Sequence, residues 1–246
     1  CDVWRRTNFW TLDIETIPDA ALYEKPETAS RAEGAPAPFP PVYAHQVVVL
    51  GVMWLDEHYG LKKLGVIGEG RGEEGMIEDF SEFVGKHRPQ LVTYNGRGFD
   101  LPVLMLRALR FGVPMPWYYQ GRLRYRYSED GHLDLCDMLT DHGAARSISL
   151  AAVARLIGLP GKIGVDGSQV EGLFHSGQLD AIKAYCLADV VQTGLLLLRF
   201  RLLQGELSAA QYREVTGAWM EQLQHDQRLA PLIEAIDGTR LLLAAA

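Results

Sequence analysis

One short segment near the start of the chain combines the pattern of a buried strand with two acidic residues: Asn8-Phe9-Trp10-Thr11-Leu12-Asp13-Ile14-Glu15-Thr16. Its apolar first half predicts a short buried strand over residues 8–13 that ends at an acidic residue. Asp13 and Glu15 are two positions apart, and such side chains project from the same face of an extended chain. Their carboxylates can therefore converge on one cation. Taken alone, the pair could equally be a solvated strand end or turn.

Strand and helix patterns alternate after this first strand. Residues 47–54 and 61–67 are apolar runs separated by about five polar residues, which predicts an antiparallel pair of strands. A further strand is expected over residues 91–94. The spacing of apolar residues predicts helices over 73–84, 101–111, 150–157, 179–203 and 209–224. This order predicts an α/β domain with a mixed sheet flanked by helices. The proline-rich segment 18–41 is expected to be a surface loop.

Composition limits the class of protein. The chain has 246 residues, 48% of them hydrophobic, which fits one large domain or one domain with an appendage. Because it shows neither a run of about 18 apolar residues nor a secretory signal, we expect a cytoplasmic protein with no membrane partner. The three cysteines and seven histidines lack the spacing of disulfide frameworks or zinc sites. The net charge of −7 argues against a basic protein that coats nucleic acid.

Two further segments present acidic residues where a ligand could bind. In Tyr94-Asn95-Gly96-Arg97-Gly98-Phe99-Asp100, a strand breaks on a loop and Asp100 stands at a helix entrance. Asp100 could simply cap that helix, but open α/β sheets also bind ligands at the ends of their strands. On the helix expected over 179–203, Tyr185 and Asp189 share one face. An aspartate on an apolar face needs a partner, which a cation would supply; a half-exposed Asp189 beside a core tyrosine is the alternative.

The three segments, in this order, resemble the exonuclease motifs of the DEDD superfamily, which implies a ribonuclease H-like fold. The chain is similar in particular to bacterial predicted exonucleases related to the proofreading exonuclease domain of family B DNA polymerases. Segments 132–135, 160–162 and 166–168 add to this resemblance, which covers residues 8–208 and leaves residues 209–246 as a helical C-terminal extension. The histidine type of this superfamily has a histidine where Ala184 stands here. Tyr185, the next residue, places the chain with the tyrosine type.

The resemblance implies a metal-dependent 3′-5′ exonuclease that releases 5′-mononucleotides from a single-stranded 3′ end, with DNA as the expected polymer. It implies two Mg²⁺ or Mn²⁺ ions, and carboxylate ligands suit these ions better than zinc. The implied metal ligands, which are also catalytic, are Asp13, Glu15, Asp100 and Asp189. Asp13 would bridge both ions, Glu15 and Asp189 would complete the site that activates water, and Asp100 would serve the second ion.

Tyr185 is the fifth catalytic candidate. An unperturbed tyrosine has a pKa near 10, so Tyr185 is expected to orient the attacking water rather than act as an ionised base. Two other functions stay open: an exoribonuclease with the same site, and a non-catalytic nucleic-acid-binding module. The sequence identifies no protein partner.

Candidate substrate contacts come from three places. Asn95 and Phe99 belong to the second motif, and Lys162 stands in a Pro-Gly-Lys turn that could bind phosphate or form an exposed loop. Segment 117–127 interleaves aromatic residues with arginines. As a strand it would place Arg122, Arg124 and Arg126 on one face, where arginines could follow phosphates while rings stack on bases. A solvated strand face is the alternative. Asp134 and Asp137 are kept outside the metal site.

Overall fold

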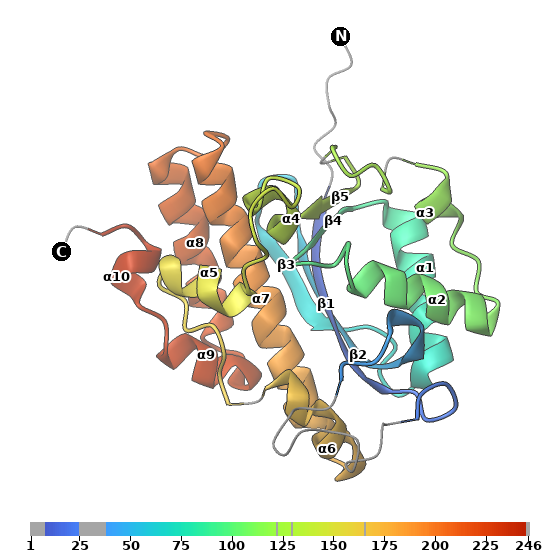
Figure 1. Cartoon of the computed structure of the whole chain (residues 1–246). Helices are drawn as coiled ribbons and strands as arrows, with labels where there is room; N and C mark the ends of the chain where they lie inside the picture. Colours follow the sequence, from blue (N-terminus) through green and yellow to red (C-terminus); the bar gives the residue numbers. More distant parts are fainter. Residues whose placement is uncertain (1–7, 25–37, 122, 129, 165, 245–246) are drawn as a thin grey trace.

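A five-stranded sheet with helices on both faces forms the centre of the computed structural model, which describes residues 8–24, 38–121, 123–128, 130–164 and 166–244 (Figure 1). The strands are ordered β3-β2-β1-β4-β5. Their bounds are β1 Phe9–Pro18, β2 His45–Leu55, β3 Leu61–Val66, β4 Gln90–Thr93 and β5 His132–Asp134. β2 is antiparallel to both of its neighbours, β1 and β3, whereas β4 and β5 run parallel to β1. The predicted α/β class with a mixed sheet is confirmed.

Three helices cover one face of the sheet: α1 Gly72–His87, α2 Asp100–Phe111 and α3 Pro116–Tyr119. The long helix α7, Leu179–Leu203, lies against the other face. The remaining helices are α4 Leu135–Leu139, α5 Leu150–Leu156, α6 Val170–His175, α8 Ala209–Leu223, α9 Ala230–Glu234 and α10 Gly238–Leu241. Short 3₁₀ turns are η2 Val42–Ala44, η3 Gly167–Gln169 and η4 Gln227–Leu229.

The first strand is longer than expected. It does not end at Asp13 but continues to Pro18, so Asp13 and Glu15 both lie inside it. β2 pairs along its length, with a bulge between Glu15 and Thr16. On the other side, β4 pairs only with Phe9–Thr11. Beyond Thr11, therefore, no strand within the described residues covers this edge of β1. Bulges and open edges of this kind often accompany active sites.

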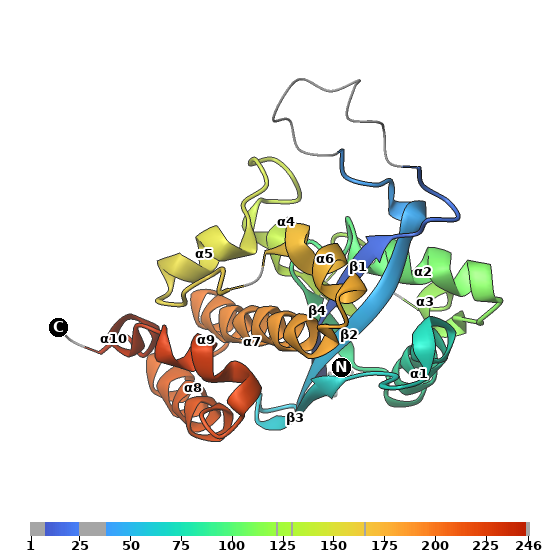
Figure 2. The ribbon, with the colours of Figure 1, turned by 90° about the horizontal axis from the view of Figure 1, so that it is seen from below.

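Helix α7 is apolar on nearly all sides because it is covered on both sides. It lies between the sheet and the C-terminal helices α8 and α9 (Figure 2). A Cβ on Gly194 would collide with Met53 of β2 and stand 3.0 Å from the Trp219 ring of α8. By length and composition alone α7 could cross a membrane, yet 67% of its most apolar window is buried inside the fold. We therefore interpret it as a core helix.

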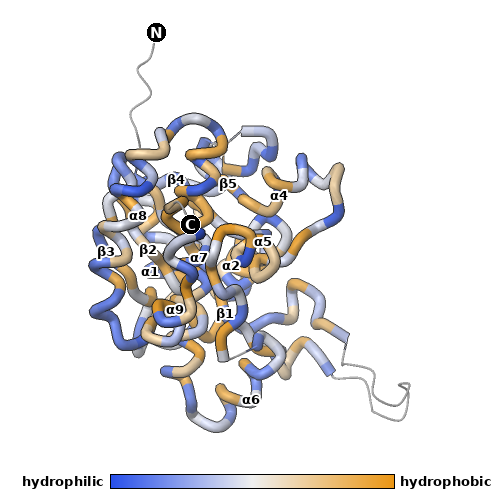
Figure 3. The backbone as a smooth tube through the Cα atoms, turned by 90° about the vertical axis from the view of Figure 1, so that its left-hand side faces the viewer, coloured by the Kyte–Doolittle hydropathy of each residue, from blue (hydrophilic) through white to orange (hydrophobic). Residues whose placement is uncertain are grey.

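The C-terminal helices belong to the same hydrophobic core as the sheet. Tyr212, Trp219 and Leu223 of α8 are buried against α7, and Leu232 and Leu241 extend this contact. Hydrophobic and hydrophilic residues alternate along this side of the chain (Figure 3), as expected for amphipathic helices with one buried face. The helical C-terminal region is thus present, while its division from the rest at residue 208 stays a prediction.

A buried ion network fixes α2 relative to β1. Arg107 of α2 donates to Asp19, just after β1, at 2.7 Å, and to Glu73 of α1 at 2.5 Å. The Glu73 carboxylate in turn accepts the backbone N–H of Val47 in β2 at 2.7 Å. Because α2 begins at Asp100, this network also holds that residue in place.

Segment 117–127 is not a strand. Pro116 begins the short helix α3, a position that proline favours, and turns follow it. Arg124 and Arg126 therefore do not line one face of the sheet, and Arg122 lies outside the described residues. The fifth strand is instead His132–Asp134, which no periodicity could identify because it has three residues. Of the proline-rich segment, residues 19–24 and 38–41 form a loop and residues 25–37 lie outside the description.

Candidate active site

Four carboxylates from three elements come together at the open edge of β1. We call this group the acidic cluster; it consists of Asp13 and Glu15 of β1, Asp100 of α2 and Asp189 of α7. Burial, followed by the charges of Asp100, Glu15 and Asp189, raises the pKa of Asp13 well above its usual value, so all three carboxylates lie near Asp13. These are the four residues that the motifs single out.

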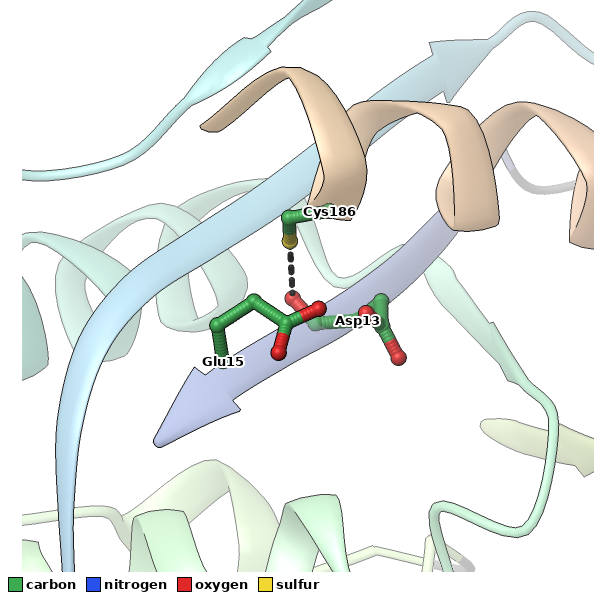
Figure 4. A group of neighbouring side chains, drawn as sticks. All are labelled: Asp13, Glu15 and Cys186. Atoms are coloured by element: carbon green, nitrogen blue, oxygen red, sulfur yellow. Dashed lines mark hydrogen bonds between the residues drawn. The ribbon is translucent and has the colours of Figure 1, made fainter. Parts of the chain in front are cut away.

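Strand β1 presents Asp13 and Glu15 toward α7. Ligand atoms of both residues lie within 4.8 Å of each other and of the Cys186 sulfur (Figure 4). The Cys186 thiol donates to the backbone oxygen of Asp13 at 3.4 Å. Burial raises the pKa of this thiol well above its usual value, so the sulfur stays protonated. Cys186 therefore positions β1 against α7 and is a poor metal ligand, since metals bind the thiolate.

A glycine opposite Asp13 permits this close approach. Gly51 of β2 pairs with Asp13, and a Cβ there would lie 2.8 Å from the Cys186 sulfur and 3.1 Å from a methyl carbon of Val190. The Thr11 hydroxyl of β1 also donates to the backbone oxygen of Val190, at 3.3 Å. The sheet and α7 are thus in direct contact where the acidic cluster forms. Sequence reasoning missed Gly51 because its neighbours come from distant parts of the chain.

Asp100 reaches across to β1 rather than capping its own helix. The N-cap position of α2 is Phe99, and the Asp100 carboxylate accepts the backbone N–H of Ile14 at 3.2 Å. That N–H lies on the part of β1 that β4 does not cover. Asp100 is only 4% exposed. The capping interpretation of Asp100 is therefore wrong.

The acidic cluster is electrostatically unfavourable without a cation. Burial, followed by the charges of Asp189 and Asp100, raises the pKa of Glu15 well above its usual value. Burial is also the main cause that raises the pKa of Asp100 to about 7 and that of Asp189 to about 6. Among the residues that the structure describes, none of these carboxylates forms an ion pair with lysine or arginine. All-carboxylate groups of this kind suit Mg²⁺ or Mn²⁺.

Gln192 links the third motif to the Pro-Gly-Lys turn. Its buried amide accepts the Gly161 N–H at 2.9 Å and donates to the Gly161 oxygen at 2.9 Å. It also donates to Asp189 at 3.2 Å. Its only sequence signal is a polar residue on an apolar helix, three positions after Asp189. Gln192 therefore orients Asp189 and places Lys162 near it.

Tyr185 lies one helical turn before Asp189 and is half-buried. Burial raises the pKa of Asp189 to about 6, and a hydrogen bond from Tyr185 limits this rise. Burial, and then the charge of Asp189, raises the pKa of the Tyr185 phenol far above its usual value. The phenol is therefore neutral at physiological pH and can donate or accept hydrogen bonds.

Lys162 stands near the acidic cluster but has its own partner. It forms an exposed ion pair with Asp166, which lowers the pKa of Asp166 to about 2. Its charge also opposes the rise that burial causes in the pKa of Asp189.

Asp134 supports the second motif rather than the metal site. Its carboxylate accepts the backbone N–H groups of Asn95 and Arg97, both at 2.8 Å, and of Cys136 at 3.0 Å. Asp137 pairs with Arg126 at 2.6 Å. Both acids therefore have partners of their own, which is consistent with leaving them out of the predicted metal site.

Two candidate substrate contacts lie on the loop before Asp100. Asn95 is exposed, with a positive φ of 64°. The Phe99 ring lies 4.9 Å from the His45 ring and 5.6 Å from the ring of Phe39, which is 74% exposed. His45 also contacts Thr16, the residue after Glu15, at 2.9 Å. An exposed aromatic group therefore adjoins both acidic motifs.

Comparison with known proteins decides the family. A sequence model described as predicted 3′-5′ exonuclease related to the exonuclease domain of PolB matches residues 37–235. The chain belongs to this family. The match includes the second and third motifs but starts after Asp13 and Glu15, which the fold brings to the same place. No curated protein matches significantly.

A solved structure shares the fold of this chain. The family B DNA polymerase from the hyperthermophilic archaeon Pyrobaculum calidifontis matches with a TM-score of 0.55 and 22% identity, over 80% of this chain and 24% of that one. The chain thus spans about a quarter of that polymerase and shares the fold of the matching region, which is ribonuclease H-like. The complex of E. coli exonuclease I with a dA16 oligonucleotide is only distantly similar, with a TM-score of 0.35 and 14% identity over 72% of this chain and 41% of that one. As a member of the PolB-related exonuclease family, the chain is a nuclease enzyme.

Proposed function

We propose that this member of the PolB-related exonuclease family removes nucleotides one at a time from a single-stranded 3′ end, preferably of DNA, and releases 5′-mononucleotides. Residues 8–208 form the exonuclease domain in this proposal, and residues 209–246 are its helical extension. The observation that carries the proposal is the acidic cluster, four converging carboxylates with raised pKa values. The two buried free thiols, Cys136 and Cys186, suit a reducing compartment such as the cytoplasm.

The acidic cluster fits two Mg²⁺ or Mn²⁺ ions. In such sites a pair of ions about 4 Å apart activates water and neutralises charge on the phosphate and the leaving oxygen. Asp13 would contact both ions, Glu15 and Asp189 would hold the ion beside the attacking water, and Asp100 would hold the other. Asp100 accepts the Ile14 N–H through Oδ1 and would bind this ion through its other carboxylate oxygen.

The protein's own groups would orient the reactants. Tyr185, as in the tyrosine type of DEDD enzyme, would position the attacking water through its neutral hydroxyl. Phe99 would stack on the base of the terminal nucleotide, since its ring already belongs to an exposed aromatic group beside Asp100. Asn95, Lys162 and Arg124 are proposed to contact the sugar-phosphate backbone, as is Arg122.

Tyr185→Phe is expected to lower turnover by roughly 10²-fold while leaving metal affinity almost unchanged. The substitution removes one hydroxyl from a half-buried ring, so the fold should persist. Turnover and the midpoint of a Mn²⁺ titration measure the two effects separately. Asp189→Ala is the matched control, because it should weaken metal binding directly. Full activity of Tyr185→Phe, or recovery of its activity at saturating metal, would return Tyr185 to a structural role.

The direct test of the proposed function uses matched DNA and RNA oligonucleotides labelled at the 5′ end, with Mg²⁺ or Mn²⁺. A ladder of progressively shorter DNA products, with 5′-mononucleotides released and no cleavage of 3′-blocked strands, is the expected result. Preferential shortening of RNA would establish the exoribonuclease alternative. Cleavage of circular single strands would contradict exonuclease action.

A further inference from the structure

A cleft of about 520 Å³ opens at the carboxyl ends of β4 and β5. Its lining includes Asn95, Arg97, Tyr118, Arg124, Asp134 and Asp137. Ligands bind preferentially at the carboxyl ends of the strands in open α/β sheets. The acidic cluster lies beside the same ends, because β1 continues past the end of β4.

Two arginines give this cleft positive charge. Within the described part of the chain, neither Arg97 nor Arg124 has a carboxylate partner. The Arg97 guanidinium donates to the backbone oxygen of His132 at 3.2 Å, and its Nε is buried without a partner. The Arg124 guanidinium is exposed and lies 5.2 Å from the centre of the Tyr119 ring. Neither positive charge is therefore neutralised by a described carboxylate, and an anion in the cleft can pair with both.

The acids that line the cleft do not cancel these charges. Asp134 is occupied by backbone N–H groups, including those of Asn95 and Arg97. Asp137 is held by Arg126 and by His142 at 2.9 Å. In a chain with a net charge of −7, this is a local reversal of sign.

The cleft adjoins the acidic cluster. Asp134, which lines the cleft, helps to raise the pKa of Asp100, and only the loop from Asn95 to Phe99 separates the cleft's edge from Asp100 in the chain. A strand whose 3′-terminal nucleotide lies at the acidic cluster can continue only in the 5′ direction. Its next phosphates need a positively charged path.

We infer that this cleft binds the phosphodiester backbone of the polynucleotide on the 5′ side of the terminal nucleotide, with Arg97 and Arg124 as its phosphate ligands. The inference rests on the proposed function. Tyr119, whose ring is 62% exposed beside Arg124, provides a surface on which an unpaired base can stack.

Arg97→Gln/Arg124→Gln tests this role through the salt dependence of binding. The probe is a fluorescent single-stranded DNA 12-mer with a hydrolysis-resistant 3′-terminal phosphorothioate, titrated in Ca²⁺ at several KCl concentrations. Each lost phosphate contact should reduce the slope of log affinity against log salt by about 0.7, so the double variant should lose about 1.4. Affinity at low salt should fall about tenfold per arginine. Arg213→Gln, an exposed arginine of α8, is the control and should change neither quantity.

A second measurement separates the cleft from the catalytic site. Hydrolysis of a dinucleotide, which is too short to fill the cleft, should fall much less in the double variant than hydrolysis of the 12-mer. If no substrate is hydrolysed by the unmodified protein, the proposed function fails, whereas an unchanged salt slope in the variants overturns the cleft. If loss of the Arg97 contacts unfolds the double variant, Arg124→Gln alone should lose about 0.7 of the slope, because its described side-chain contacts are with exposed or half-buried rings.

Discussion

Asp100→Asn is expected to lower the rate of nucleotide release by on the order of 10³-fold, because it removes a charged ligand from a site that must stabilise transition-state charge. The same change should raise the melting temperature of the metal-free protein at pH 8. At that pH the buried carboxylate is ionised and surrounded by other acids, whereas the asparagine is neutral. Its amide oxygen can still accept the Ile14 N–H.

Initial rates of nucleotide release, and thermal unfolding in EDTA, measure the two effects of Asp100→Asn. Asp180→Asn is the matched control, since the Asp180 side chain is 97% exposed at the start of α7 and should affect neither quantity strongly. A variant at Asp100 that keeps full activity would contradict the metal-ligand role. A metal-free variant that is less stable than the parent at pH 8 would show that the carboxylate is structural instead.

Mn²⁺ is expected to raise the melting temperature far more at pH 8 than at pH 5, by on the order of 10 °C at pH 8. The folded-state pKa values of Asp100, about 7, and Asp189, about 6, exceed the usual value of 3.8. The metal-free folded protein therefore binds more protons than the unfolded chain. As the pH rises from about 4 to 7, the contribution of these two carboxyl groups to the free energy of unfolding decreases. Bound cations offset that loss at pH 8, while protons already do so at pH 5.

Other groups do not disturb this comparison. Burial lowers the pKa of His45, and that of His132 to about 3, so both histidines make the fold more stable as the pH rises. Their contribution to stability is the same with and without Mn²⁺. It therefore cancels when the gain is taken as the difference between the two melting temperatures. Scanning calorimetry at both pH values provides the measurement. Equal gains at pH 5 and pH 8, or an undiminished gain in Asp100→Asn/Asp189→Asn, would contradict metal binding by the acidic cluster.

The sequence could predict elements whose periodicity is long and regular. The helix expected over 179–203 is observed as Leu179–Leu203, because most of its apolar residues are buried between two layers. The extension of β1 to Pro18 was missed because the polar residues Glu15 and Thr16, which serve the site, interrupt the apolar pattern of the strand. The strand His132–Asp134 has only three residues, too few to show a period. The aromatic and arginine-rich segment was expected to be a strand, but the short helix α3 begins at Pro116 and covers the start of that segment.

The acids of the site could be found from sequence because three motifs carry them, but their supporting contacts could not. Gln192 orients Asp189 through a turn 31 residues earlier in the chain, and Gly51 permits contact with Cys186. Neither residue has a local pattern that distinguishes it. Arg97 lies inside the second motif, yet its position in a cleft with Arg124 depends on how the loop after α3 folds. Such roles follow only from tertiary structure.

Anomalous scattering from a crystal soaked in Mn²⁺ would locate the bound ions directly. We expect two ions about 4 Å apart, with protein oxygen ligands at roughly 2.1 Å from Asp13, Glu15, Asp100 and Asp189. Ions bound elsewhere, an ion held by the Cys186 sulfur, or carboxylates more than about 10 Å apart around an empty site would contradict it.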